Sequence, residues 1–339
     1  MPQVGLGVHQ VGCKVLLLRL LLQSRGFSLP AQVGEEELST AVRAALAAGY
    51  TYFDSSFLYS KETTLGKVLE QELATAGLAR DQMFLLTKLP PNGLRPDLVE
   101  TFLRLSLSRL RLEYLDMYLI HWPCGTVHTG KNEETHPLDS EGFLQQDLAT
   151  DLEAVWAAME DLVTKGLVRS IGLSNFNMDQ VLRILKSCKI PPANLQVEVN
   201  LLHQNTELVQ FCQANKMVVT AYAALGCPGR FDFSSSVVFP SDPDTLAVTG
   251  LLSQPTVVTM AKEIGCSPGQ LLLSFLTKVL GVVVIPKSTN PYRIKENMDI
   301  FRISLSEDQV KVLLSMNRNI RSFKGDVMKV REQHPEFPF

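Results

Sequence analysis

The chain of 339 residues has few of the features that mark several large classes of protein. Its six cysteines are scattered, without the short paired spacing of zinc or redox sites, so we expect reduced thiols in a cytosolic protein and no metal site. The net charge of −3, without a cluster of Lys and Arg, argues against nucleic-acid binding. The longest leucine-rich run, residues 15–22, is far shorter than the roughly 20 apolar residues of a membrane span. The remaining expectation is a soluble protein whose partner is a small molecule.

The amino-terminal segment is also poor in charge, because residues 1–34 contain no Asp or Glu. An acid-free start with a leucine run can be typical of a transit or secretory peptide, but Arg19 interrupts the run and basic residues are few. Cleavage would also remove residues 3–8, which we predict to be the first strand. The sequence therefore favours a cytosolic protein over an imported one.

From residue 35 onward, short apolar or β-branched runs alternate with segments of helical period. Continuous apolar strands joined by crossover helices predict a parallel sheet. The expected helices cover residues 35–49, 95–111, 151–166, 178–188, 205–213 and 254–265, and the expected strands cover residues 3–8, 51–54, 83–88, 115–121, 168–174, 195–199, 217–222 and 281–287.

Two architectures fit this alternation, an open doubly wound sheet and a closed barrel of eight strands. No G-x-G-x-x-G follows the first predicted strand, so the dinucleotide fingerprint of the open sheet is missing. We therefore predict one α/β domain over residues 1–339, a (β/α)₈ TIM barrel with a closed parallel sheet. Catalytic residues of such barrels lie at the carboxyl ends of the strands. These ends are polar here: Asp54, Lys88, His121, Ser174, Glu198, Tyr222 and Lys287.

Seven ordered segments carry a resemblance to a known family. They are residues 49–69, 85–89, 115–123, 171–176, 195–200, 220–226 and 284–297, among them "GYTYFDSSFLYSKETTLGKVL", "LDMYLIHWP" and "VIPKSTNPYRIKEN". In these segments the chain resembles the aldo-keto reductases, nearest to the aldose and aldehyde reductase branch. The resemblance implies a monomeric (β/α)₈ barrel that reduces aldehydes or ketones with NADPH.

The resemblance implies four catalytic residues, and their side chains suit the reduction of a carbonyl group. Reduction of a carbonyl needs a hydride at carbon and a proton at oxygen. Tyr59 maps to the proton donor, and Lys88 is expected to lower its pKa, which is ordinarily about 10. Asp54 is expected to pair with Lys88 and to face the cofactor, and His121 to orient and polarise the carbonyl. Taken alone, Asp54 is about as well explained as the N-cap of the helix that follows it.

By the same resemblance, the cofactor NADPH or NADP⁺ is held by polar groups at the barrel rim. Two cations and a hydroxyl near the start of the last crossover helix favour NADPH over NADH, because they suit an extra 2′-phosphate. The nicotinamide contacts implied are Ser174, Asn175 and Gln196 for the carboxamide, with Tyr222 stacked on the ring and Leu225 nearby. The contacts implied at the other end are Lys287, Ser288 and Arg293 for the phosphate, with Glu296 and Asn297 on the adenine side.

The substrate is predicted only as a class, a small or medium carbonyl compound. Phe57, Leu58 and Trp122, with His121 and the carboxy-terminal residues 318–339, are expected to line an apolar pocket. Residues 11–32 are predicted to be an atypical insertion after the first strand: a lid, a targeting remnant or aberrant translated sequence. Because this insertion disturbs the front of the barrel, a catalytically idle NADPH-binding regulatory or structural protein is the alternative.

Overall fold

Eight parallel strands follow one another in chain order in the central sheet of the computed structural model, which describes residues 26–28, 34–228, 243–324, 330 and 332–339. The seven strands predicted between residues 51 and 287 are confirmed, with ends shifted by up to a few residues. The strands are β1 (Gly26–Ser28), β2 (Tyr52–Asp54), β3 (Phe84–Leu89), β4 (Met117–Ile120), β5 (Ile171–Ser174), β6 (Asn194–Glu198), β7 (Val218–Tyr222) and β8 (Val283–Val284).

The first strand differs from the prediction. Residues 3–8 lie outside the described residues, and the position beside β2 is held by β1, whose Phe27 pairs with Phe53 in parallel register. Strand β1 lies inside the predicted insertion 11–32, so residues 26–28 of that range belong to the sheet, while residues 11–25 and 29–32 lie outside the described residues. The run "GFS" has little strand signal of its own, and the neighbouring strand supplies its hydrogen-bond partners.

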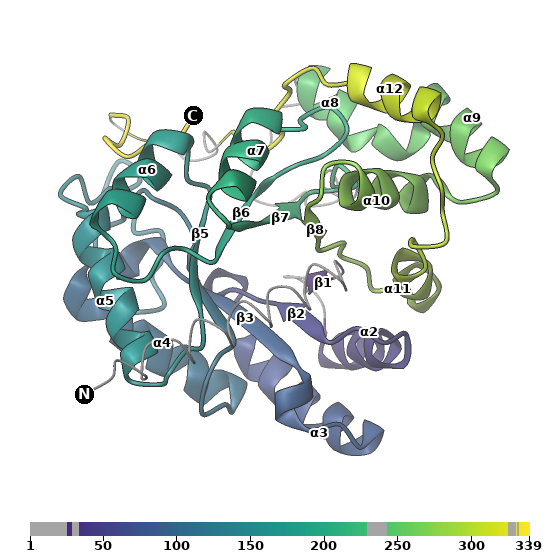
Figure 1. The fold of residues 1–339 in the computed structure, drawn as a ribbon. Coiled ribbons are helices and arrows are strands. Elements are labelled where there is room, and N and C mark those ends of the chain that lie inside the picture. Colours follow the sequence, from purple (N-terminus) through teal and green to yellow (C-terminus); the bar gives the residue numbers. More distant parts are fainter. Residues whose placement is uncertain (1–25, 29–33, 229–242, 325–329, 331) are drawn as a thin grey trace, which may run out of the picture.

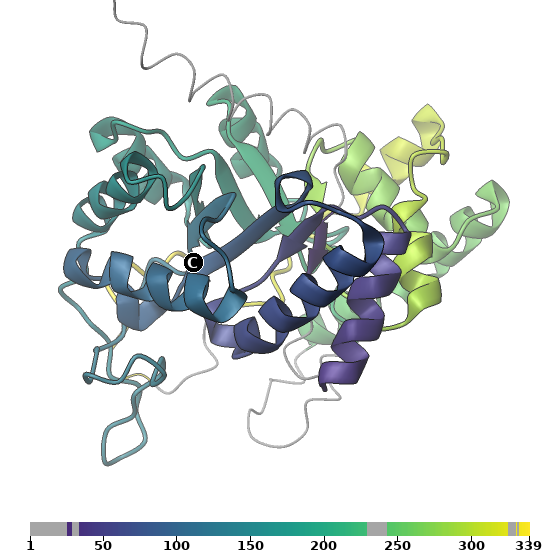
Figure 2. The ribbon, with the colours of Figure 1, turned by 90° about the horizontal axis from the view of Figure 1, so that it is seen from below.

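Helices connect the strands and cover the outside of the curved sheet in both ribbon views (Figures 1 and 2). Several begin at side-chain caps: Asn177, Ser267 and Ser306 each accept a backbone N–H from the first turn and form capping boxes. The helices are α2 (Glu35–Ala47), α3 (Glu62–Ala76), α4 (Pro96–Leu110), α5 (Leu152–Thr164), α6 (Met178–Ser187), α7 (Thr206–Ala214), α8 (Pro243–Thr249), α9 (Pro255–Ile264), α10 (Pro268–Lys278), α11 (Pro291–Met298) and α12 (Glu307–Ser315). In the part of the chain that the structure describes, no helix is long and apolar enough to cross a bilayer.

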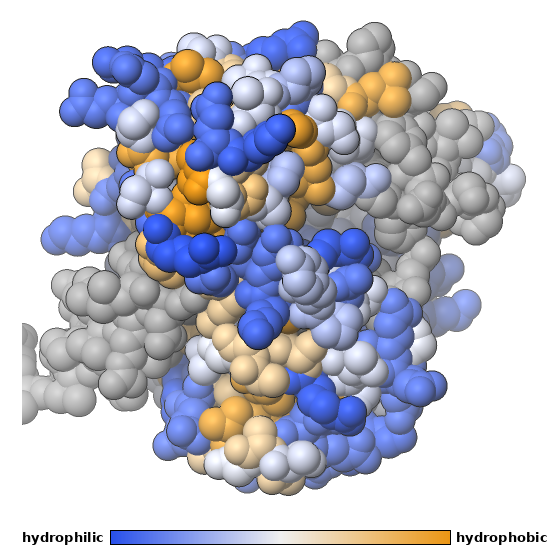
Figure 3. Space-filling model, turned by 90° about the vertical axis from the view of Figure 1, so that its right-hand side faces the viewer, coloured by the Kyte–Doolittle hydropathy of each residue, from blue (hydrophilic) through white to orange (hydrophobic). Residues whose placement is uncertain are grey.

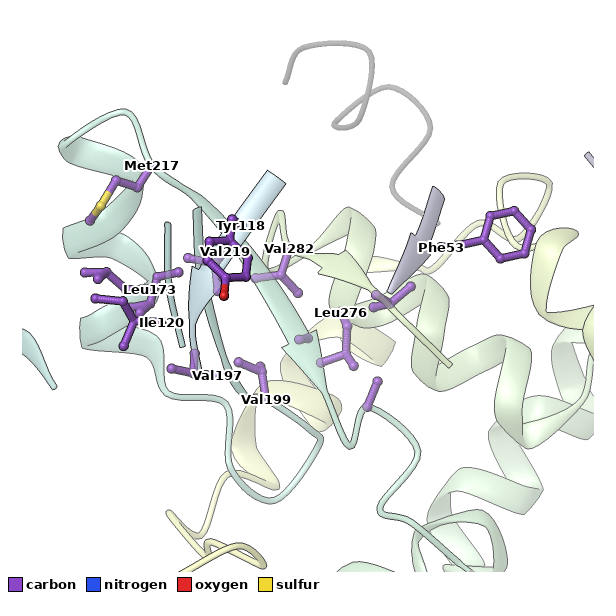
Figure 4. Close-up of a cluster of buried hydrophobic side chains, with 14 of the residues drawn as sticks. Phe53, Tyr118, Ile120, Leu173, Val197, Val199, Met217, Val219, Leu276 and Val282 are labelled. Atoms are coloured by element: carbon purple, nitrogen blue, oxygen red, sulfur yellow. The ribbon is translucent and has the colours of Figure 1, made fainter. Parts of the chain in front are cut away.

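Two layers of buried side chains lie on opposite sides of the strands. In β4, Tyr118 and Ile120 pack in the large cluster between the sheet and the helices, part of which is drawn in Figure 4. Met117 and Leu119 belong to a smaller cluster made almost entirely of strand residues, on the inside of the sheet. This alternation follows from the two-residue period of a strand.

The same period determines where the polar strand ends point. Tyr52 and Leu86 belong to the inner cluster, so Asp54 and Lys88, each two residues further on, also face the inside of the sheet. Thr87 faces the other way, and its hydroxyl donates to the buried carboxylate of Glu62 in α3 at 2.7 Å. The sequence pattern thus brings the carboxylate of Asp54 and the amine of Lys88 to the same inner edge of the sheet.

Candidate active site

Asp54 and Lys88 form an ion pair at the carboxyl ends of β2 and β3. The Lys88 Nζ lies 2.6 Å from Asp54 Oδ1, and both side chains are completely buried. Lys88 Nζ also donates to the backbone oxygen of Ser55 at 2.8 Å. The predicted pairing is therefore present. Burial lowers the pKa of Lys88, while the negative charge of Asp54 acts in the opposite direction.

The second carboxylate oxygen of Asp54 is also occupied. Asp54 Oδ2 accepts from Gln196 Nε2 at 2.7 Å and from the Tyr52 hydroxyl at 3.4 Å. The cap of the following 3₁₀ turn η1 (Phe57–Tyr59) is instead Ser56, whose Oγ accepts the Leu58 N–H. The alternative interpretation of Asp54 as a helix cap is thus wrong. Its side chain points to the inside of the sheet and pairs with Lys88, and Ser56 caps the turn instead.

Turn η1 brings Tyr59 to the same edge. Lys88 Nζ lies 5.5 Å from the centroid of the Tyr59 ring. The ring also packs edge-to-face against His121, with 6.1 Å between centroids. The structure therefore brings the four predicted catalytic residues together, although they are spread over residues 54–121 of the sequence.

The pKa of Tyr59 shifts in the direction opposite to the one expected from Lys88. Burial raises the pKa of Tyr59, and the negative charges of Asp54 and Cys227 raise it further. The expectation of a pKa below the ordinary value is wrong for Tyr59, because burial and the negative charges of Asp54 and Cys227 outweigh the lowering effect of the Lys88 cation. The consequence is a phenol that stays protonated at neutral pH, the form that a proton donor needs.

His121, just after the end of β4, is a neutral imidazole. Burial lowers its pKa well below the ordinary value, and the charge of Lys88 lowers it further, followed by that of His136. Its Nδ1 lies 2.9 Å from Ser56 Oγ. No hydrogen-bond partner for Nε2 is found among the described residues, so this nitrogen is free to bind a ligand.

The predicted nicotinamide contacts surround this group at the ends of β5, β6 and β7. Asn175 has a left-handed backbone with φ of 63°, and its Nδ2 donates to the backbone oxygen of His121 at 2.9 Å. The Tyr222 hydroxyl donates to Asn175 Oδ1 at 2.7 Å. Ser174 and Gln196 are buried beside them. The amides of Asn175 and Gln196 are thus already oriented. Among the described residues, no partner is found for the hydroxyl hydrogen of Ser174 or for the side-chain oxygen of Gln196.

The predicted phosphate contacts lie around the start of α11. The Arg293 side chain is exposed, and its Nε donates to the buried Ser288 Oγ at 3.4 Å. Lys287 is also exposed, and within the described ranges neither cation has a carboxylate partner. Two unpaired cations and a hydroxyl at a helix start fit a phosphate group chemically. Further along α11, Glu296 is half-buried and Asn297 is buried. Leu225, which follows β7, packs against the core.

The predicted substrate residues are not all at the mouth. Trp122 is half-buried and packs edge-to-face against Phe339, with 5.9 Å between ring centroids, so the carboxy-terminal end lies beside it. Phe57 is buried against Phe102 of α4 and under the guanidinium of Arg109. The prediction that Phe57 lines the pocket is wrong, because the turn of η1 directs its ring into the helix layer. Leu58 is half-buried, and its role stays a prediction.

The role of Glu198, at the end of β6, was not predicted from the sequence. Its buried carboxylate accepts the backbone N–H groups of Ser322 and Phe323, at 2.9 Å and 2.8 Å. Phe323 in turn packs edge-to-face on Tyr222, at 5.4 Å between centroids. Glu198 thus fixes the carboxy-terminal segment beside the strand ends. The only signal in the sequence is an acid at the end of an apolar run.

The chain is similar to known proteins in sequence and in fold. A family model described as the Aldo/keto reductase family matches residues 24–318. Aldo-keto reductase family 1 member A1 of Xenopus tropicalis is 37% identical, covering 92% of this chain and 91% of that protein. Member A1-A of Danio rerio is 38% identical over 100% of this chain and 95% of its own. The solved aldose reductase of Schistosoma japonicum superposes with a TM-score of 0.81 at 36% identity, covering 93% of this chain and 94% of that one.

Proposed function

Because the chain belongs to the aldo/keto reductase family, we propose that it reduces aldehydes and ketones to alcohols with NADPH, with Tyr59 as the proton donor. The observation that carries this proposal is the buried Asp54–Lys88 pair beside Tyr59 and His121. An acid kept protonated, a free imidazole nitrogen and a buried cation at one edge suit the transfer of a proton to a developing oxyanion.

The residues present fit a nicotinamide dinucleotide. When bound, NADPH supplies the hydride that goes to the carbonyl carbon. We propose that Ser174, Asn175 and Gln196 hold the carboxamide and that Tyr222 lies against the ring, which would present one ring face to the substrate. Lys287, Ser288 and Arg293 would bind the 2′-phosphate, with Glu296 and Asn297 near the adenine and Leu225 and Asp54 close to the cofactor.

In the proposed reaction, Tyr59 gives its hydroxyl proton to the substrate oxygen while His121 donates a hydrogen bond to the same oxygen. Lys88 stabilises the phenolate that Tyr59 becomes, and Asp54 keeps Lys88 charged and in place. The Lys88 cation thus favours the proton transfer that forms the phenolate, while burial keeps the resting phenol protonated. Trp122, Leu58 and the carboxy-terminal residues would form the apolar wall of the substrate pocket.

We further propose that the sheet closes between β8 and β1, and that the protein is a cytosolic monomer of the NADP-dependent alcohol dehydrogenase or aldose reductase type. Helices on the outside and an inner cluster on the inside support closure. On the face seen in Figure 3, hydrophilic residues separate the apolar areas, which supports a monomer.

The test is loss of NADPH absorbance with a reactive aromatic aldehyde. Tyr59→Phe should lower kcat by about 10²- to 10⁴-fold, the usual contribution of a general acid, while NADPH still binds. Tyr114→Phe is the matched control, because Tyr114 precedes β4 at the opposite end of the strand and contacts Arg80 and Arg169. Unchanged turnover in Tyr59→Phe would show that the donor is wrongly assigned, and no turnover of any carbonyl would reject the proposal.

A further inference from the structure

Ser56 makes two hydrogen-bond contacts that together constrain His121. Its side chain is completely buried, and its Oγ lies 2.9 Å from His121 Nδ1. The same oxygen accepts the backbone N–H of Leu58 at 3.2 Å, as the cap of η1. The Leu58 N–H can only donate, so one lone pair of Ser56 Oγ is committed to it.

The remaining hydrogen of Ser56 decides which nitrogen of His121 is protonated. If Nδ1 carried a hydrogen, Ser56 Oγ would accept from two donors, and its own buried hydrogen would have no acceptor among the described residues. A buried donor without an acceptor is destabilising. If Ser56 instead donates to an unprotonated Nδ1, the Ser56 hydrogen, the Ser56 oxygen and His121 Nδ1 all have partners, and in the neutral imidazole the hydrogen lies on Nε2.

We propose that Ser56 is a positioning residue that holds His121 as the Nε2–H tautomer, which leaves an unused N–H donor beside Tyr59 for the carbonyl oxygen of the substrate. Nε2 has no other partner within the described ranges, and the edge-to-face contact with Tyr59 places the imidazole next to the proton donor. This inference rests on the proposed function for its use, but the tautomer itself is a property of the resting protein.

The tautomer can be measured without turnover. In protein with ¹⁵N-labelled histidine, the two ring nitrogens of a neutral imidazole give separate signals for the protonated and unprotonated atom. The chain has six histidines, so His121→Asn identifies the signals of His121 by their loss. We expect a protonated Nε2 and an unprotonated Nδ1 at neutral pH. A protonated Nδ1 in the unaltered protein would overturn the proposal without any variant of Ser56.

Two variants then test whether Ser56 is the cause. Ser56→Ala should convert the His121 signals to a mixture of tautomers and lower kcat by about three- to tenfold, with the KM for NADPH unchanged, because the donor is present only part of the time. Ser56→Thr keeps the hydroxyl and should restore both the signals and kcat. The matched control is Ser274→Ala in α10, which removes a buried hydroxyl that has no partner among the described residues.

These readouts separate the two proposals. If the His121 signals of Ser56→Ala are identical to those of the unaltered protein, Ser56 does not determine the tautomer. This conclusion holds whether or not the variant reduces carbonyl compounds. If the unaltered protein has the expected signals and Ser56→Ala alters them, but no carbonyl compound is reduced, the assignment of Ser56 stands and the proposed reaction fails.

Discussion

Replacing Lys88 by methionine should destabilise the fold by about 3–5 kcal/mol, the usual cost of breaking a buried ion pair. At 2.6 Å and an effective dielectric constant of ~20, the gross attraction between Lys88 and Asp54 is about 6 kcal/mol. The loss of hydration of the two ions offsets much of it. The methionine removes the cation but leaves Asp54 buried, with Gln196 and Tyr52 as its remaining side-chain donors among the described residues.

A double-mutant cycle with Asp54→Asn isolates the pair. Each single variant should cost about 3–5 kcal/mol, whereas the double variant should cost clearly less than their sum, because it leaves no unpaired charge. The assay is urea unfolding followed by circular dichroism. Lys311→Met is the matched control, since Lys311 pairs with Asp308 in a largely exposed contact of 3.2 Å and should cost at most about 0.5 kcal/mol.

Two results would refute this reasoning. Single variants that each cost less than about 1 kcal/mol and simply add would show that the two side chains are not coupled in the folded protein. A Lys88→Met variant as stable as the Lys311→Met control would show that the Nζ reaches water instead of Asp54.

Further outcomes follow from the same structure. The pKa of His121 lies below its ordinary 6.5 and that of Tyr59 above its ordinary 10. The value of kcat/KM for reduction should therefore not change from about pH 6.5 to 10. A titration midpoint of kcat/KM inside that range would contradict one of the two shifts. Burial raises the pKa of Glu62 above its ordinary 4.5, so just above pH 4.5 the folded state binds more protons than the unfolded state. The free energy of unfolding should therefore fall as the pH rises from 4.5 through the folded-state pKa. Glu62→Gln should remove this fall, which unfolding titrations at several pH values would measure. Arg293→Ala should raise the KM for NADPH about tenfold and leave the KM for NADH unchanged. The control is Lys295→Ala, because Lys295 is also an exposed cation on α11. Equal effects of Arg293→Ala on both cofactors would argue against a contact with the 2′-phosphate.

The sequence was most informative where two periodic signals coincide. Apolar runs indicate the strands, and the two-residue period then determines which side chains share the inner face. Asp54 and Lys88 can be paired in this way from the residue pattern alone, because each ends a buried strand and neither charge can be buried alone. His121 and Ser174 follow from the same rule, since the carboxyl ends of parallel strands meet at one edge.

Residues in turns were less predictable, because the direction of their side chains depends on backbone angles that no local period determines. Phe57 and Tyr59 are only two residues apart, yet η1 sends the first ring into the helix layer and the second to the mouth. The short strand β1 was missed for a related reason, since its pairing with β2 outweighs a weak local propensity.

The electrostatics of the site also needed distances. From sequence, a lysine near a tyrosine suggests a lowered phenol pKa, but the burial of Tyr59 and the negative charge of Asp54 outweigh the effect of Lys88 and raise the pKa. A buried ion pair is weak support for stability, since apolar side chains of similar size often stabilise a fold at least as well. The Asp54–Lys88 pair is therefore better explained by the charge that Tyr59 acquires when it gives up its proton, which an apolar pair could not stabilise.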